Sequence, residues 1–161
     1  MPRILIAYFS ASGVSKQVAK YLSESCRGTL YEIRPKIPYT KSDLDYSNNN
    51  SRVSKEIYDK SIRPPLADKN AQIEQYDVIL LSFPIWFYLP PLIIYTFLES
   101  YNFQGKKIIL FPTSHISDFG NIPLDMKNHV DKTTQIIKGK VSHGNVTKQE
   151  VDNWIKNLNL F

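Results

Sequence analysis

The chain has 161 residues, which is long enough for one domain whose hydrophobic core needs neither a disulfide nor a metal. Its only cysteine, Cys26, excludes a disulfide framework and a thiolate metal site, so we expect a reducing, cytoplasmic location. The first residues lack the charged start and long apolar centre of a signal peptide, and no later apolar stretch has the length of a membrane span. We therefore expect a soluble protein without a membrane partner, folded as a single domain over residues 1–161.

The net charge of +5 by itself suggests nucleic acid or an acidic membrane as a partner. However, the lysines and arginines are scattered singly or in pairs, and the densest pair is Lys106-Lys107. No basic stripe alternates with aromatic residues, as a nucleic-acid groove would require. This distribution indicates a solvated surface and argues against both nucleic acid and an acidic membrane as a partner.

Apolar runs predict the strands of a sheet. Four of them are continuous rather than alternating, which is typical of strands covered on both faces in a parallel sheet. These runs cover residues 4–9, 78–83, 108–111 and 136–137, and we expect a weaker strand at 30–33.

Helical periodicity falls between the strands, first over residues 14–22 and then from Pro90-Pro91 through Leu98. A last helix begins with a capping box at Thr147 and Glu150, and its apolar spacing places Trp154 in the core. Alternating strands and helices predict a doubly wound α/β fold with three layers. Between residues 35 and 76 the pattern is irregular, with one helix expected near 53–60, and so long a connection is often functional.

The turn from the first strand into the first helix is rich in hydroxyl groups. It contains Ser10, Ser12 and Ser15 together with Gly13, which lets a backbone approach closely. Free N–H groups and the positive end of the helix dipole suit a phosphate at such a place. The alternative is a simple helix cap.

Two further loops follow the strands at 78–83 and 108–111. One is the proline-bracketed aromatic segment 84–90, which suits a flat ring unless its aromatics only cover the core. The other covers residues 113–120. In open α/β sheets, ligands bind beyond the carboxyl ends of the strands, where these three loops are expected.

In their order and spacing, the three loops resemble those of the flavodoxins, specifically the short-chain bacterial flavodoxin-like proteins that bind FMN. The similarity extends along the whole chain and includes Pro38-Tyr39, Arg63-Pro64, Gly105-Lys106-Lys107 and the tail 139–158. The resemblance implies a five-stranded parallel sheet of strand order 2-1-3-4-5, with FMN as the cofactor.

The resemblance also implies roles for individual residues. The loop that holds the FMN phosphate matches Ser10, Ala11, Ser12, Gly13, Val14 and Ser15. The loop beside the isoalloxazine ring matches Pro84, Ile85, Trp86 and Phe87, and we expect Trp86 or the adjoining Tyr88 to stack on the ring. The loop along the pyrimidine edge matches Thr113, Ser114 and Gly120. His115 stands where the family usually has a small residue, and it is either a flavin contact or a solvent-exposed histidine.

Two redox functions and one non-redox function are compatible with these features. The first is an electron carrier that docks on a redox partner protein, for which no acid–base residue is required. The second is an FMN-dependent oxidoreductase that takes hydride from NAD(P)H and reduces a quinone-type acceptor. The third is a regulatory α/β domain without a cofactor. Asp118 and Asp125 form no convincing catalytic pair, because helix capping and solvation explain them.

Overall fold

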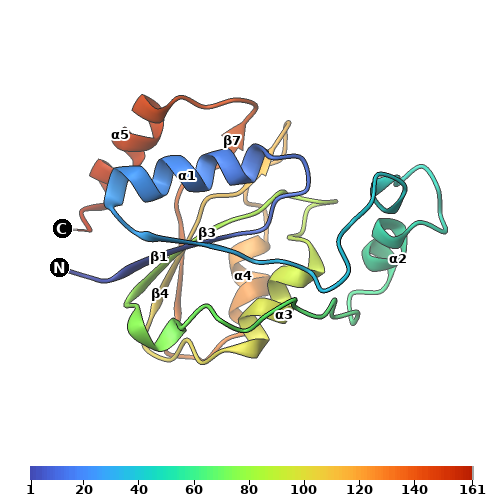
Figure 1. The fold of residues 1–161 in the computed structure, drawn as a ribbon, viewed down its shortest axis with the longest axis horizontal. Coiled ribbons are helices and arrows are strands. Elements are labelled where there is room, and N and C mark those ends of the chain that lie inside the picture. The colour runs from blue at the N-terminus through green and yellow to red at the C-terminus, as the bar shows by residue number, and fades with distance from the viewer. Residues whose placement is uncertain (161) are drawn as a thin grey trace.

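The computed structural model describes residues 1–160 and contains a central sheet of five parallel strands (Figure 1). Their spatial order is β2-β1-β3-β4-β6, and β6 is the fifth strand of this sheet along the chain. The expected order 2-1-3-4-5 is therefore confirmed. The strands are β1 (Ile4–Tyr8), β2 (Thr29–Glu32), β3 (Val78–Ser82), β4 (Lys107–Leu110) and β6 (Gln135–Lys138).

Helices cover both faces of this sheet, which gives the expected three layers (Figure 1). One face carries α1 (Val14–Cys26) and α5 (Lys148–Leu158), and the other carries α3 (Leu92–Ser100) and α4 (Ile122–Lys127). None of the helices within residues 1–160 is long and apolar enough to cross a membrane.

The central strands supply both hydrophobic cores because successive side chains of a strand point to opposite faces. In β1, Ile4 and Ile6 pack in the core beneath α1 and α5, whereas Leu5 and Ala7 pack in the core beneath α3 and α4. Every residue of β1 and β3 is buried, which explains their continuous apolar sequences. The outer strands β2 and β6 are more exposed.

The last helix begins as its capping box predicts, since the hydroxyl of Thr147 accepts a hydrogen bond from the Glu150 N–H at 3.2 Å. Trp154, expected in the core, is only half-buried. Its ring stacks on Phe111 with the centroids 6.1 Å apart, so it closes the edge of the core beneath α5. The spacing identified the correct face of the helix but not the depth of its burial.

Outside the long connection between β2 and β3, three short elements had no counterpart in the sequence pattern. One is α4, six residues long with a proline in its first turn. The others are β5 (Thr113–Ser114) and β7 (Ser142–His143), which pair in parallel as a separate two-stranded sheet. Elements this short are invisible to a periodicity argument, because they contain no more than about one or two turns of helix or one pair of strand residues.

The long connection between β2 and β3 contains η1 (Ser42–Leu44), α2 (Arg52–Tyr58) and η2 (Ile73–Gln75). Its helix, expected at 53–60, is confirmed at nearly the same place. The arms of this excursion pair with each other where the Lys36 N–H donates to the Pro65 carbonyl and the Ala67 N–H donates to the Arg34 carbonyl, each at 2.8 Å. Figure 1 shows α2 beyond the end of the sheet at which β1 leads into α1.

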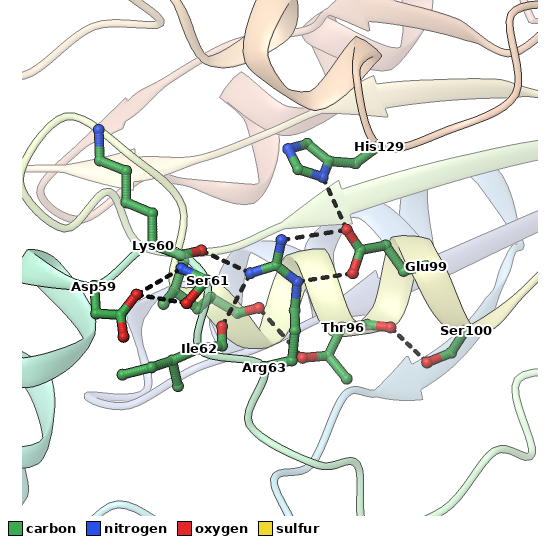
Figure 2. A network of polar contacts seen from close by, with 10 residues as sticks. Asp59, Lys60, Ser61, Ile62, Arg63, Thr96, Glu99, Ser100 and His129 are labelled. Carbon is green, nitrogen blue, oxygen red and sulfur yellow. Dashed lines mark hydrogen bonds and ion pairs between the residues drawn. The ribbon is translucent and has the colours of Figure 1, made fainter.

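Arg63 fastens the end of this excursion to the helices α3 and α4 (Figure 2). Its guanidinium donates to both carboxylate oxygens of Glu99, at 2.7 and 3.3 Å. It also donates to the carbonyl of Lys60 at 2.8 Å, which fixes the turn after α2. His129, just after α4, completes the network with a contact of 2.9 Å between its Nδ1 and Glu99 Oε2.

We predict that Glu99→Gln destabilises the fold at neutral pH by at most about 1 kcal/mol, because the Glu99 side chain is 39% exposed. The hydrogen bond from Arg63 holds the pKa of Glu99 below its usual range, and His129 adds to this effect. A carboxylate with a lowered pKa stabilises the fold above its unfolded-state pKa, and this contribution is lost as the pH falls through the folded-state pKa. The stability gap between parent and variant, measured by urea unfolding, should therefore close between about pH 5 and pH 3.

The matched control is Glu24→Gln, because Glu24 is exposed on α1 and forms no ion pair among the described residues. It should leave stability nearly unchanged across this range. A gap for Glu99→Gln that stays constant down to pH 3 would contradict the assignment of this carboxylate to the network.

Candidate functional site

The three predicted loops lie together at one edge of the sheet and meet at Thr113. Because β1, β3 and β4 are parallel, their carboxyl ends face the same way. The Thr113 hydroxyl lies 2.9 Å from the Ser15 hydroxyl at the start of α1. The Thr113 carbonyl accepts a hydrogen bond from the Ile85 N–H at 2.9 Å. The Thr113 N–H donates to the Phe83 carbonyl at 2.9 Å. Thr113, which belongs to the third loop, therefore connects that loop to the first and the second.

The first loop exposes the start of α1 to solvent. Gly13, the residue before the helix, has φ of 95°, a left-handed conformation that glycine adopts without strain. Its N–H donates to the Ser10 hydroxyl at 3.0 Å, so Ser10 shapes the turn. Ala11, Ser12 and Gly13 are all exposed. The loop thus presents the hydroxyl of Ser12 beside the unpaired N–H groups of a 13-residue helix.

Ser15 and Val14 lie deeper than the other residues of the first loop. Ser15 is buried, and its hydroxyl forms a pair with that of Thr113, while Val14 is half-buried. In such a pair one hydroxyl donates to the other, and the accepting hydroxyl keeps a proton that it can donate elsewhere. Ser15 therefore has a structural role beside the one predicted for it, which is binding of the phosphate.

The second loop is a tight hairpin with aromatic residues at its tip. The N–H of Trp86 donates to the Leu89 carbonyl at 2.8 Å, and the N–H of Leu89 donates back at 3.1 Å. Phe87 and Tyr88 have φ of 48° and 67°, as a two-residue turn of type I′ requires. This left-handed backbone conformation costs roughly 1–2 kcal/mol for each bulky residue. Strain of this kind is concentrated at binding sites, where it holds a side chain in a fixed position.

The aromatic residues of this hairpin differ in their surroundings. Trp86 is half-buried and packs edge-on against Phe9 and Tyr39, with ring centroids 5.7 and 5.6 Å apart. Phe87 and Tyr88 are 57% and 78% exposed. Trp86 is thus partly the core cover that was the alternative prediction. The two tip residues bury little, although the Phe87 ring packs edge-on against Tyr46 with the centroids 5.9 Å apart, and both can contact a ligand.

The third loop is braced by Ser114 and by His143, a residue that the sequence pattern did not single out. Ser114 accepts the Ser117 N–H on its hydroxyl at 2.9 Å. The ring nitrogen Nε2 of His143, on β7, lies 2.8 Å from the Ser117 carbonyl, which it can approach only as an N–H donor. His115 is exposed and Gly120 has φ of 52°. No local signal identified His143, because its role comes from the pairing of β7 with β5.

Part of the long connection also reaches the site, through a buried carboxylate. Glu56 on α2 is 6% exposed, and both its oxygens accept from the Tyr39 hydroxyl at 2.8 Å. The Arg52 guanidinium lies 3.7 Å from Glu56 and 3.7 Å above the Tyr39 ring. Burial raises the pKa of Glu56, while its two partners act in the opposite direction. This cluster supports Trp86, because Tyr39 packs directly on the indole.

A groove of about 530 Å³ lies beside the aromatic hairpin, a size typical of small-molecule sites. Its walls are the α2 excursion, residues 86–92 and the end of the third loop just before α4. They comprise Val53, Glu56, Ile57, Lys60, Trp86, Phe87, Tyr88, Leu89, Pro90, Pro91, Leu92, Asp118, Gly120 and Asn121. Trp86, Phe87, Tyr88 and Gly120 were predicted for the cofactor site, so the groove adjoins that site. Residues 10–15 of the first loop do not line it.

Several solved structures have the same fold as this chain over nearly its whole length. A proposed flavoprotein from Bacteroides eggerthii is 34% identical, with a TM-score of 0.91 over 100% of both chains. Another, from Bacteroides uniformis, is 37% identical, with a TM-score of 0.87 over 96% of this chain and 98% of that one. A flavoprotein from Lactobacillus acidophilus in complex with FMN shares the fold at 22% identity, with a TM-score of 0.68 over 96% and 99%.

No curated protein matches the sequence. The sequence model of the flavodoxin family, by contrast, matches residues 3–158, which is nearly the whole length. This match includes all three loops and the strands that position them. The chain therefore belongs to the flavodoxin family.

Proposed function

We propose that this protein binds FMN at the three loops around Thr113 and transfers electrons through it. The observation that carries the proposal is their convergence: a hydroxyl-rich helix start, an aromatic hairpin and a polar edge meet at one end of a flavodoxin sheet. FMN, when bound, supplies electron-transfer chemistry that protein side chains lack. The Lactobacillus acidophilus relative of the same fold was crystallised with FMN.

The residues present fit this cofactor. The exposed segment 11–13 offers the Ser12 hydroxyl to the phosphate, beside the first N–H groups of α1 at the positive end of its dipole. No arginine lies in the loop, so neutral donors hold the phosphate. The exposed rings of Phe87 and Tyr88 suit the apolar flavin ring, and Thr113 and Ser114 lie where its polar edge is expected.

Within this function, a carrier role needs only the cofactor site and a surface for a redox partner protein. A specific observation favours the second candidate, an FMN-dependent NAD(P)H oxidoreductase with a small acceptor. The groove beside the hairpin has the size of a small-molecule site, and a pure carrier does not need one. The net charge of +5 also suits an anionic nicotinamide cofactor.

We predict that Ser12→Ala weakens FMN binding about tenfold or more and leaves riboflavin binding almost unchanged, since a hydrogen bond to a charged group contributes roughly 1.5–3 kcal/mol. Ser12 is exposed and its hydroxyl has no partner among the described residues, so the fold should not suffer. Fluorescence titration of the FMN-free protein with both ligands measures this. The control is Ser12→Thr, which keeps the hydroxyl and should bind FMN like the parent. Equal losses for FMN and riboflavin would place the phosphate elsewhere.

A second prediction concerns Tyr88 and Trp86. Replacing either stacking ring by alanine should raise the fluorescence of bound FMN and weaken its binding by about 1–2 kcal/mol. Trp86→Ala should also lower the melting temperature, because Trp86 packs on Phe9 and Tyr39, whereas Tyr88→Ala should not. Tyr58→Ala is the matched control, since Tyr58 is also 78% exposed but does not line the groove. If both site variants bound FMN and fluoresced like the parent, neither ring would stack on the flavin.

Stopped-flow mixing of the FMN-loaded protein with NADPH distinguishes the two roles. An oxidoreductase should bleach the flavin absorbance within seconds without any other protein. For a carrier, bleaching should require an added reductase. Protein that retains no flavin after incubation with FMN would contradict both roles and favour the cofactor-free regulatory domain.

A further inference from the structure

The groove beside the cofactor site has walls suited to a flat aromatic molecule. One wall consists of the aromatic hairpin and the prolines that follow it, Pro90 and Pro91. The facing wall comes from α2, where Val53 is buried and Ile57 half-buried. Rigid aromatic and proline surfaces lose little conformational entropy when a planar ligand binds between them.

The charged side chains that line the groove differ in whether they already have partners within the protein. The Glu56 carboxylate is already engaged by the Tyr39 hydroxyl and the Arg52 guanidinium. Asp118 lies at the end formed by the third loop and accepts the Phe119 N–H on its carboxylate at 2.8 Å. Lys60, in the turn after α2, has no ion-pair partner within residues 1–160. Figure 2 shows its side chain extending away from the Arg63–Glu99 pair.

The position of Lys60 is fixed although its side chain is free. Arg63 donates to the Lys60 carbonyl at 2.8 Å and is itself bound to Glu99 of α3 (Figure 2). The backbone at Lys60 is thereby tied to the helix whose first residues form part of the groove wall. A cation held at the rim of an apolar groove selects a ligand that has one anionic or strongly polar end.

We propose that this groove binds the electron acceptor, a quinone-type bicyclic ring whose anionic substituent lies at Lys60. The ring would lie between Pro90 and Pro91 and the α2 wall, beside the rings of Trp86, Phe87 and Tyr88 that border the proposed cofactor site. In the reaction the quinone gains two electrons and two protons from reduced FMN and becomes the hydroquinone, which leaves oxidised FMN. NAD(P)H would regenerate the reduced flavin by giving it a hydride, with one further proton from solvent, and would leave as NAD(P)⁺. The inference rests on the proposed function, because it places the acceptor beside the proposed FMN site.

The test is isothermal titration calorimetry of the oxidised, FMN-loaded protein with 1,4-naphthoquinone-2-sulfonate and with uncharged 2-methyl-1,4-naphthoquinone. No reductant is added, so the readout is binding and not turnover. Lys60→Gln should weaken binding of the sulfonate about fivefold and that of the uncharged quinone less than about twofold. Ile57→Trp, which fills the groove, should weaken both about tenfold or more. The matched control is Lys156→Gln, an exposed lysine of α5 on the other face of the sheet, which should change neither.

FMN affinity is measured first for each protein and should be equal in all of them. A parent that fails to bind FMN would overturn the proposed function itself. A parent that binds FMN but neither quinone would overturn only the groove assignment. The groove assignment would also be overturned if Lys60→Gln bound the sulfonate as tightly as the parent and Ile57→Trp bound both quinones as tightly as the parent. Near-ultraviolet circular dichroism verifies that Ile57→Trp is folded, and Lys60→Gln, a surface change, keeps the assignment testable in any case.

Discussion

The burial of a parallel sheet on both faces is the constraint on which the rest of this structure depends. Strands β1 and β3 are buried along their whole length, so each must alternate between two hydrophobic cores, one beneath α1 and α5 and one beneath α3 and α4. Parallel strands need a crossover after each one, and every crossover begins at the same edge of the sheet. The candidate site lies at this edge because its three loops follow the carboxyl ends of β1, β3 and β4, which all end there.

Contacts of Thr113 fix the positions of the three loops relative to one another. Thr113 bonds to the first loop through its hydroxyl and to the second through its backbone, and β7 pairs with β5 beside it. The hairpin at Trp86–Leu89 is closed by two backbone hydrogen bonds, which offset part of the strain at Phe87 and Tyr88. The loops are thus positioned before any ligand arrives, which lowers the entropic cost of binding.

The long connection between β2 and β3 adds a feature beyond the sheet and its helices. It carries α2 to the cofactor end of the sheet, where Tyr39, Arg52 and Glu56 support Trp86 from behind. Arg63 then anchors the excursion to α3 through Glu99. A wall is thereby formed opposite the aromatic hairpin, and the space between them is the groove. This is the reason to consider a small acceptor and not only a protein partner.

The sequence by itself determined the class of fold, the strand order through the family resemblance, and the three loops that meet in the candidate site. The fold class and the loops depend on local patterns, namely continuous apolar runs, the capping box at Thr147 and a hydroxyl-rich turn before α1. Only the tertiary structure decided which hydroxyls are exposed. Ser12 and Ser15 look equivalent in the sequence, yet Ser15 is buried against Thr113, 98 positions away. The bracing by His143, the half-buried Trp154, the short α4 and the groove at α2 likewise arise from contacts between distant segments, and no local pattern encodes such contacts.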